Sequence, residues 1–348
     1  RSIRMTARGF WFLFVVTFLA VGLAGHAAWQ RHAAAIGSVS AEPVFPGLSD
    51  RLNEAAAIQL EDRRDSVTLV RAGEGWVVET AHNYPARGDA VRALVLALAD
   101  LQIVEAKTER PEMFARLEVE PLDAEGARSR RITVLDGAGK VLADLIVGKK
   151  RHGQGGQPDA HYVRRPDGGQ AFLAESRLDP RVEPIDWLDR RIADISRGRV
   201  QQVVIDHPGG ISLTVAKDSR EGNDFRVVDL PEDMKVENQF TLNATAGTLD
   251  RLVFDEVMPA AGLALQEHVT RYTTFDGLAV TIGFAEHDGK LWSRYTAAAL
   301  DDAAEEVKAE AAEINARAEG WAYRLADFKN EQLRRKLEDL AKKQEGSS

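Results

Sequence analysis

Residues 202–215 read QVVIDHPGGISLTV, two runs of alternating apolar and polar residues on either side of a Pro-Gly-Gly turn. Residues 57–71, AIQLEDRRDSVTLVR, have the same design roughly 145 residues earlier, which indicates an internal duplication. A third run follows in each place, at residues 75–78 and 224–228. Alternation of this kind predicts a three-stranded antiparallel meander with one buried face in each half of the chain.

The same elements follow each meander. Asp89 is a good N-cap for a helix over Ala90–Leu101, whose apolar side is Val91, Leu94, Val95, Leu98 and Leu101. Its counterpart is predicted from about Asn243 to Val253. Strand hairpins come next, and a closing strand ends each half. The predicted hairpins are 131–135 with 141–148 and 278–284 with 291–295, and the closing strands are 161–164 and 321–325.

This order of elements predicts an α+β fold, in which two tandem copies of an antiparallel-sheet-plus-helix unit follow one N-terminal transmembrane helix. Three further helices are expected: a short connection over Pro184–Ile192, an acidic amphipathic insertion over Asp301–Gly320, and a C-terminal helix from Asp327 to about Lys343. The thin apolar stripe of the insertion is Ala303, Val307, Ala311, Ile314 and Ala318. The predicted domains are a cytoplasmic stub and anchor (1–31), a tether (32–46), two repeats (47–196 and 197–326) and the C-terminal helix (327–348).

The N-terminal segment has the features of a membrane anchor. Arg1, Arg4 and Arg8 precede an uncharged run from Gly9 to Gln30, whose 22 residues span roughly 33 Å as a helix, enough for a bilayer core. The positive-inside rule keeps the arginines in the cytoplasm and sends the rest of the chain across the membrane. A cleaved signal peptide is the alternative, and it also exports the body of the protein.

The composition excludes several kinds of chemistry. A net charge of -9 argues against nucleic acid as a partner, and the absence of cysteine removes disulfides, thiol catalysis and cysteine metal sites. No phosphate loop, nucleophile elbow or dinucleotide fingerprint is present, so we predict no catalytic residue, no cofactor and no metal.

Weaker candidates each have a structural alternative that we favour. A metal between His152, His161 and Asp159 competes with a solvated hairpin loop. Carboxylate pairs could act in general acid–base catalysis, but charges at helix ends explain them better. Tryptophans could stack on sugars, but packing in the core explains them better. These pairs and tryptophans are Asp186 with Asp189, Asp301 with Asp302, and Trp76, Trp187, Trp292 and Trp321.

One basic run is a candidate contact surface. Lys149, Lys150 and Arg151 open a polar loop in the first half, and they could touch anionic lipid headgroups or an acidic partner. The alternative is a run that is simply solvated.

Several short motifs in fixed order resemble the bacterial domain-of-unknown-function family 4340, over nearly everything after the tether. They are 45–48 (FPGL), 75–78 (GWVV), Pro85, 147–149 (VGK), 162–164 (YVR), 187–192 (WLDRRI) and 320–325 (GWAYRL). The resemblance implies an accessory protein of a gliding-motility-type ABC transporter, single-pass in the bacterial inner membrane with its C-terminal domain in the periplasm. It supplies no functional residues.

Three functions therefore compete. The leading hypothesis is a non-enzymatic scaffold that docks on the transporter permease or its periplasmic auxiliary subunit and is held in the inner membrane through residues 9–30. The second is a module that binds an envelope glycan or lipid in a cleft between the two repeats. The third is an enzyme such as a hydrolase, for which the sequence offers no candidate residues.

Overall fold

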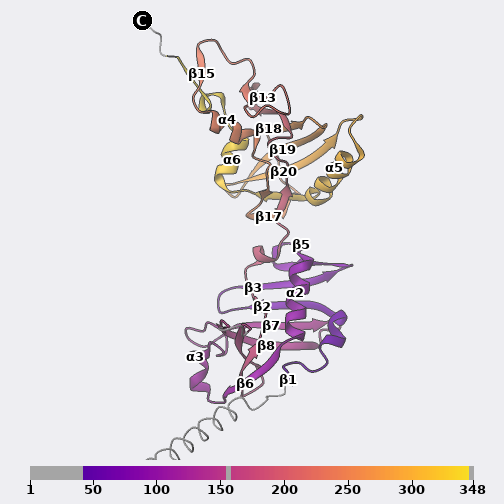
Figure 1. Cartoon of the computed structure of the whole chain (residues 1–348), viewed down its shortest axis with the longest axis vertical. Coiled ribbons are helices and arrows are strands. Elements are labelled where there is room, and N and C mark those ends of the chain that lie inside the picture. Colours follow the sequence, from indigo (N-terminus) through magenta and orange to yellow (C-terminus); the bar gives the residue numbers. More distant parts are fainter. Residues whose placement is uncertain (1–41, 154–157, 345–348) are drawn as a thin grey trace, which may run out of the picture. The chain divides into compact units, whose positions relative to one another are not determined.

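The computed structural model describes residues 42–153 and 158–344, which form a sheet-rich α+β fold with some helices (Figure 1). Contacts between residues divide the chain into two compact units. Of the described residues, unit 1 contains those from 42 to 65 and from 92 to 181, and unit 2 contains Ser66–Val91 and those from 182 to 344. The division therefore does not follow chain order, because residues 66–91 pack with the second half of the chain.

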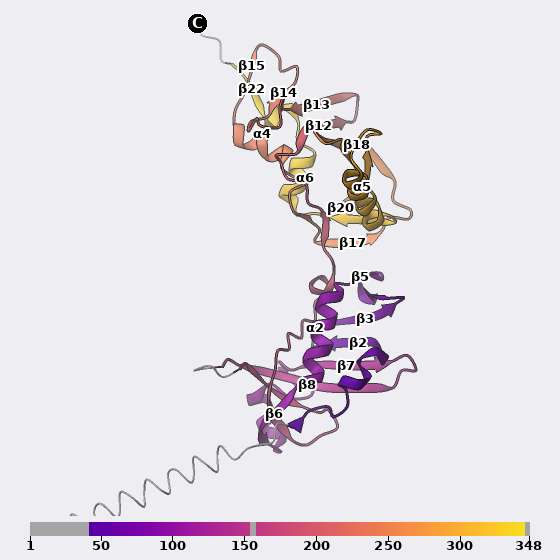
Figure 2. The ribbon, with the colours of Figure 1, turned by 45° about the vertical axis from the view of Figure 1, so that its right-hand side comes forward.

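Unit 1 contains an antiparallel sheet with the hydrogen-bonded order β1-β6-β10-β9-β8-β7-β2. Helix α2 (Gly88–Ala99), which begins in unit 2, lies along β2, β7 and β8 in two views (Figures 1 and 2). Its buried side chains Leu94, Val95 and Leu98 are on the apolar side that the sequence predicted. The other elements of unit 1 are β1 (Glu42–Pro43), η1 (Ser49–Glu54), β2 (Ala55–Glu61), β6 (Gln102–Thr108), η3 (Pro111–Met113), α3 (Phe114–Leu117), β7 (Arg130–Asp136), β8 (Val141–Arg151), β9 (Ala160–Arg164) and β10 (Ala171–Glu175).

Unit 2 contains an eight-stranded antiparallel sheet with the order β14-β13-β12-β18-β19-β20-β21-β17, together with a β3-β4-β5 meander and the small pairs β11-β16 and β15-β22. Its strands are β3 (Ser66–Ala72), β4 (Gly75–Val78), β5 (Tyr84–Pro85), β11 (Arg191–Ala193), β12 (Val200–His207), β13 (Ile211–Ala216), β14 (Arg226–Val227), β15 (Met234–Val236), β16 (Leu252–Val253), β17 (Glu256–Pro259), β18 (Leu265–Thr274), β19 (Leu278–His287), β20 (Lys290–Ala299), β21 (Trp321–Arg324) and β22 (Ala341–Lys343). Its helices are η2 (Glu79–Ala81), η4 (Pro184–Trp187), α4 (Gln239–Ala246), α5 (Glu305–Ala318), α6 (Asp327–Leu333) and η5 (Leu337–Asp339).

An aromatic cluster explains why residues 66–91 belong to unit 2. Tyr84 at the start of β5 is 1% exposed, and its ring packs edge-on against Phe254 at 5.3 Å and Trp321 at 4.9 Å. Its hydroxyl lies 3.4 Å from the hydroxyl of Tyr323. Burying an aromatic ring in this way stabilises by a few kcal/mol, so the meander is firmly attached to this part of the chain.

The two sheets share one strand order. From the first strand outward, unit 1 has β2-β7-β8-β9-β10-β6 and unit 2 has β12-β18-β19-β20-β21-β17. In both sheets, the first strand after the helix that joins the main sheet pairs with the last strand of the series. These pairs are β6 with β10 in unit 1 and β17 with β21 in unit 2. By this order β7 and β8 correspond in position to β18 and β19, and β9 corresponds to β20. The prediction instead aligned β7 and β8 with β19 and β20, and β9 with β21, which is one strand too far along the second half. The cause is β18, whose sequence LQEHVTRYTT has too many polar residues for its alternation to be recognised.

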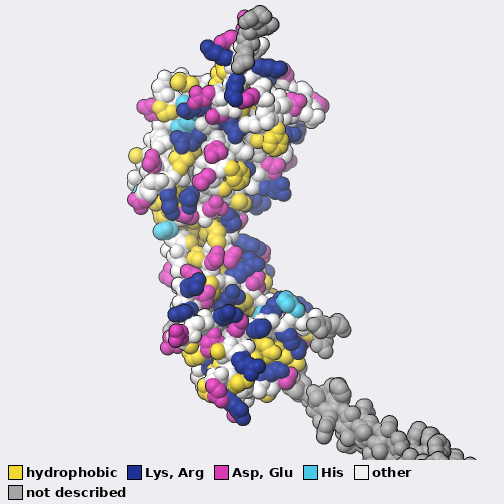
Figure 3. All heavy atoms as spheres, turned by 90° about the vertical axis from the view of Figure 1, so that its left-hand side faces the viewer, with side chains coloured by type: hydrophobic (Ala, Val, Ile, Leu, Met, Phe, Trp, Pro, Cys, Tyr) yellow, Lys and Arg dark blue, Asp and Glu magenta, His cyan; other side chains and the backbone are white. Residues whose placement is uncertain are grey.

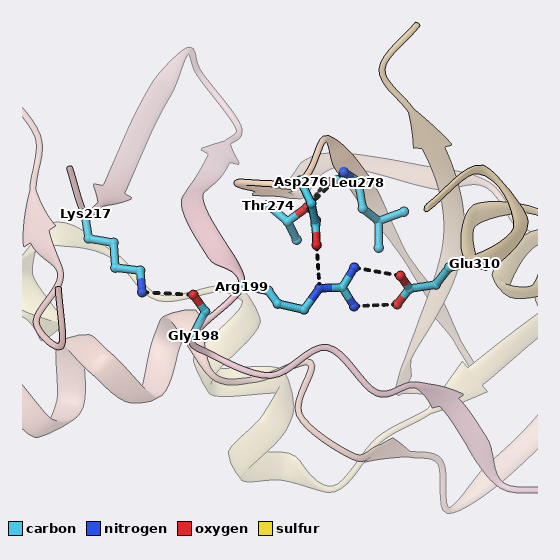
Figure 4. A network of polar contacts seen from close by, with 7 residues as sticks. All are labelled: Gly198, Arg199, Lys217, Thr274, Asp276, Leu278 and Glu310. Atoms are coloured by element: carbon cyan, nitrogen blue, oxygen red, sulfur yellow. Dashed lines mark hydrogen bonds and ion pairs between the residues drawn. The ribbon is translucent and has the colours of Figure 1, made fainter. Parts of the chain in front are cut away.

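A polar network attaches the inserted helix α5 to the sheet (Figure 4). The Arg199 guanidinium donates two hydrogen bonds to the Glu310 carboxylate, at 2.9 and 2.7 Å, and a third to Asp276 at 2.9 Å. Asp276 also accepts from the Thr274 hydroxyl. The hydrogen bonds that Arg199 donates to Glu310 and Asp276 raise its pKa, so this guanidinium stays charged at all ordinary pH values. On its other side α5 buries Val307, Ala311, Ile314 and Ala318, as the sequence predicted.

We expect Glu310→Gln to lower the free energy of unfolding by about 1–2 kcal/mol, because it removes a bidentate charge-assisted pair and keeps the shape of the side chain. The measurement is urea unfolding followed by circular dichroism. Glu305→Gln is the matched control, since its side chain lies on the same helix, is 87% exposed and, among the described residues, pairs only with Lys308. Equal effects of the two substitutions would contradict the role given to Arg199.

A buried lysine holds the loop that follows β13. Lys217 is 5% exposed, and its ammonium donates to the carbonyl oxygens of Gly198, Arg220 and Gly222 at 3.1, 3.3 and 3.1 Å. It also lies 5.3 Å from the ring of Phe225, which favours the cation. The contact with Gly198 is visible in Figure 4.

The C-terminal helix is shorter than predicted. Helix α6 ends at Leu333 because the carbonyl of this residue accepts the Thr270 hydroxyl, and the chain then turns through η5 into β22, which pairs with β15. The segment Pro184–Ile192 was predicted to be a short connecting helix, but it contains only the 3-10 turn η4. Strand β11 begins near its end and pairs with β16.

Helix α4 also begins earlier than predicted, since the Asn238 side chain caps it by accepting from the backbone N–H groups of Phe240 and Thr241.

The predicted anchor, residues 9–30, lies outside the described residues. Within residues 42–153 and 158–344 no helix combines the length and apolar character needed to cross a membrane. The predicted tether ended at residue 46, but Glu42–Pro43 already pair with β6 and Val44 is buried, so the fold begins before that point.

Candidate functional site

The basic run predicted as a contact surface lies at the end of β8. The ladder between β8 and β9 slips between Val147 and Lys150, which is a bulge that includes Gly148 and Lys149. Lys149 is exposed, Lys150 lies opposite His161, and Arg151 is the last residue of the strand. The structure therefore presents the three cations from a kinked strand end instead of a free loop.

A close backbone crossing makes this bulge possible. A Cβ atom at Gly148 would lie 2.3 Å from the carbonyl oxygen of Leu117 and 2.5 Å from that of Glu118, so only glycine fits. The crossing segment is held by Arg164, which is 5% exposed and donates to the Val119 carbonyl oxygen at 2.9 Å. The same guanidinium lies 4.7 Å from the ring of Phe114 and donates to three further carbonyl oxygens in residues 165–168.

Above this crossing is a cavity of about 740 Å³, a size in the range of ligand and peptide sites. Lys149 and Lys150 line it and Arg151 does not. The cavity also gathers charged side chains that are distant in sequence, from β7, from the crossing segment and from the chain after β10. The charged lining residues are Arg128, Arg130, Lys149, Lys150, Arg177, Glu118, Asp159, Glu175 and Asp179.

Some of these charges neutralise one another. Lys150 pairs with Asp159 at 2.7 Å, and Arg128 lies 3.5 Å from Glu118. Among the described residues, Arg130, Lys149 and Arg177 form no ion pair, and of the lining carboxylates only Glu175 is likewise unpaired. The cavity thus presents a surplus of positive charge, although the surface in general mixes both signs, as the face in Figure 3 shows.

Buried polar atoms lie beside the cavity. Within the described residues, Nδ1 of His161 has no hydrogen-bond partner, and the same is true of Glu120 Oε2 and Ser129 Oγ next to lining residues. Burial, helped by the charge of Lys150, lowers the pKa of His161 to about 4. The hydrogen bond from Lys150 and one from the Gly153 N–H lower the pKa of Asp159 to about 2. Neither group changes its charge near neutral pH, so neither is suited to general acid–base catalysis there.

The other candidates do not form a site with these residues. His152 lies 3.7 Å from Asp159, but Lys150 occupies the same carboxylate, and no group of three metal-ligating side chains occurs in the described part of the chain. Asp301 and Asp302 lie on an exposed turn, and Asp189 accepts from the Arg191 N–H.

Core packing is confirmed for two of the tryptophans. Trp187 and Trp292 are 4% and 6% exposed. Trp76 and Trp321 are half-buried, the first under the guanidinium of Arg71 and the second against Tyr84.

Sequence reasoning missed Arg128, Arg130 and Arg177, the partners of Lys149 in the cavity. The only local signal was the cluster of arginines at 128–131, which precedes a strand. It also missed a second cavity, in unit 2, lined by His207 and His268.

The model of a family described as a domain of unknown function, DUF4340, matches residues 76–268, more than half of the chain. No curated protein matches the sequence.

Proposed function

This chain belongs to the DUF4340 family, and from that premise we propose that it is a non-enzymatic accessory component of an ABC-type transport system, which acts by docking on the permease or its periplasmic auxiliary subunit. In this proposal residues 9–30 anchor the chain in the bacterial inner membrane, and the folded body lies in the periplasm.

The observation that carries the proposal is the unpaired positive charge at the first cavity. Arg130, Lys149 and Arg177 gather there from three parts of unit 1, and among the described residues none of the three forms an ion pair with a carboxylate of the lining. A gathered charge surplus of this kind steers and orients an acidic partner surface. The shifted groups beside it, His161 and Asp159, have pKa values of about 4 and 2, which supports binding in preference to proton transfer.

We further propose that the body arose from two copies of one unit. The shared order of six strands supports this, as does the return of β6 and β17 to the same place in each sheet. Duplication would supply two similar scaffolds, of which only the first carries the basic bulge.

We expect Lys149→Glu to reduce co-purification with the transporter subunits by about tenfold, because charge reversal at an interface both slows association and adds repulsion. The measurement is affinity purification of the full chain from detergent-solubilised membranes, with quantitative mass spectrometry of the bound proteins. Lys140→Glu is the control, since Lys140 is an exposed cation of unit 1 outside the cavity.

The result can also go against the proposal. Full co-purification with Lys149→Glu would remove the cavity from the interface. Loss of binding to vesicles that contain anionic phospholipid, with unchanged co-purification, would instead assign the basic bulge to a lipid surface.

A further inference from the structure

The last described part of unit 2 is held on the face of its sheet by side chains of two strands. After α6 ends at Leu333, residues 334–344 pass through η5 into β22, which pairs with β15 (Figure 2). Thr270 of β18 donates its hydroxyl to the Leu333 carbonyl oxygen, and Nε2 of His207 on β12 lies 3.1 Å from the Arg335 carbonyl oxygen. We call residues 334–344 the latch.

A buried histidine adjoins the start of the latch. His268 of β18 is 2% exposed, and its ring packs against those of His207 and Phe284, at centroid distances of 4.8 and 5.0 Å. Hydrogen bonding with the backbone of Leu333 occupies one ring nitrogen, and the other, Nε2, has no partner among the described residues. A second N–H on this ring would therefore be enclosed without an acceptor, which is costly for a charged donor.

Burial and neighbouring charges keep His268 neutral. Burial has the largest effect on its pKa, followed by the charges of His207 on β12 and Arg334 in the latch. Together they lower the pKa to about 4, whereas a hydrated imidazole titrates near 6.5. The neighbour from β19 is Phe284, which carries no charge. The closed structure therefore opposes protonation of this ring through both burial and charge.

Carboxylates near His268 do not compensate. Among the described residues, Asp206 is the carboxylate whose charge acts on His268, but it accepts the Ser212 hydroxyl at 2.8 Å and lies 3.8 Å from the Arg271 guanidinium. Further charged residues and both histidines line the cavity of about 990 Å³ beside the latch. The others are Asp327, Glu331, Arg335, Lys336, Glu338 and Asp339. Because this space lies beside the latch, a small displacement of residues 334–335 would admit water to His268.

These contacts couple closure of the latch to the proton on His268. With the latch in place the ring is enclosed and neutral, and once it is hydrated it takes up a proton below about pH 6.5. Opening therefore binds a proton between pH 6.5 and about pH 4, so acid favours opening. The contribution of the neutral ring to closure is complete above pH 6.5 and is lost as the pH falls toward 4.

We propose that residues 334–344 form an acid-released latch, which stays on the sheet while His268 is neutral and detaches when this ring is protonated. Detachment uncovers Leu340 and Ala341, both 1% exposed in the closed form, and leaves the edge of β15 without its partner strand. The surface that unit 2 presents then changes with pH. The inference is independent of the proposed function, because no residue of the basic cavity takes part in it.

Hydrogen exchange of the purified full chain, measured by mass spectrometry, tests the latch. Protection factors are compared, because they remove the intrinsic pH dependence of the exchange chemistry. Between pH 7.5 and pH 5 we expect the protection of the latch to fall about 30-fold, the factor that follows when opening raises a pKa from about 4 to 6.5. Strand β20 should keep its protection in the same samples. An equal loss in β20 overturns the inference, because unit 2 then opens as a whole.

His268→Phe removes the titrating group and keeps an aromatic ring in its place. We expect the protection of the latch in this variant to be independent of pH between 7.5 and 5, whatever its absolute value. His287→Phe is the matched control, since His287 also belongs to unit 2 but its side chain is 47% exposed, and this variant should keep the 30-fold loss.

Two ion pairs at the end of the latch are the competing explanation. Lys342 pairs with Glu237 at 2.7 Å and Lys343 with Asp233 at 3.7 Å, and acid can neutralise both carboxylates. Exposed pairs of this kind contribute little to stability. An acid response that survives His268→Phe would assign the release to these pairs and overturn the inference.

A disulfide provides a second test in which His268 stays in place. The chain contains no cysteine, and the exposed residues Lys235 and Lys342 lie opposite each other on β15 and β22. The double variant Lys235→Cys with Lys342→Cys can therefore be bridged by oxidation. The reduced protein should lose protection in acid as the wild type does, whereas the oxidised protein should keep it. Equal loss in both forms overturns the inference, because β22 then need not leave β15.

Discussion

Gly148→Ala is expected to lower the free energy of unfolding by about 3 kcal/mol, the upper end of the usual penalty for overpacking. The added methyl group would lie 2.3 and 2.5 Å from the carbonyl oxygens of Leu117 and Glu118, and backbone atoms cannot rotate away as a side chain can. The β8 strand or the crossing segment must shift. Urea unfolding monitored by circular dichroism measures the loss.

The matched control is Gly137→Ala in the turn between β7 and β8, where a Cβ atom would have nothing within 4 Å. This substitution should change stability by no more than about 0.5 kcal/mol. Because the crossing segment carries Glu118 into the first cavity, Gly148→Ala should also weaken whatever binds at Lys149. A stable Gly148→Ala protein would show that the crossing is looser than described.

Acid is expected to destabilise the protein by several kcal/mol between about pH 6.5 and pH 4. Burial lowers the pKa of both His161 and His268 from 6.5 to about 4 in the folded state. The unfolded chain therefore binds more protons than the folded chain in this interval. The contribution of the two neutral imidazoles to stability is fully present above pH 6.5 and is lost as the pH falls toward the folded pKa of about 4. Each shift corresponds to about 3 kcal/mol at most.

Urea midpoints measured at pH 7.5, 6, 5 and 4 test this expectation. His268→Leu and His161→Leu should each flatten part of the decline, whereas His287→Leu, an exposed histidine, should leave the profile unchanged. Parallel profiles for wild type and both buried variants would mean that the two rings are hydrated in solution.

The sequence predicted best those elements whose packing is local. Helix α5 was recognised because Val307, Ala311, Ile314 and Ala318 recur at helical spacing, and the structure buries all four. The α+β class followed from the alternating runs. The prediction of the C-terminal helix was wrong from Arg334 onward, because the end of the helix depends on Thr270, 63 residues away in sequence. No pattern in residues 327–343 contains that hydrogen bond.

The candidate site shows the same limit. Lys149 and Lys150 were found because they are adjacent in sequence, but their cavity forms only when β8 pairs with β9 and the segment 117–119 crosses over Gly148. Arg128 and Arg177 come from other strand ends, and only the strand order brings them together. The second cavity was even harder to predict from the sequence, since His207 and His268 are 61 positions apart. Only the pairing of β12 with β18 brings their rings into contact.

Arg164 and Lys217 hold their loops in an unusual way, through carbonyl oxygens and aromatic rings instead of carboxylates. Carbonyl groups do not titrate, and dissolved ions screen an enclosed dipole poorly. Neither clamp therefore loosens when acidic residues become protonated or when ionic strength rises. Both clamps should therefore persist at a pH and a salt concentration at which the exposed carboxylate pairs of the surface are already weakened.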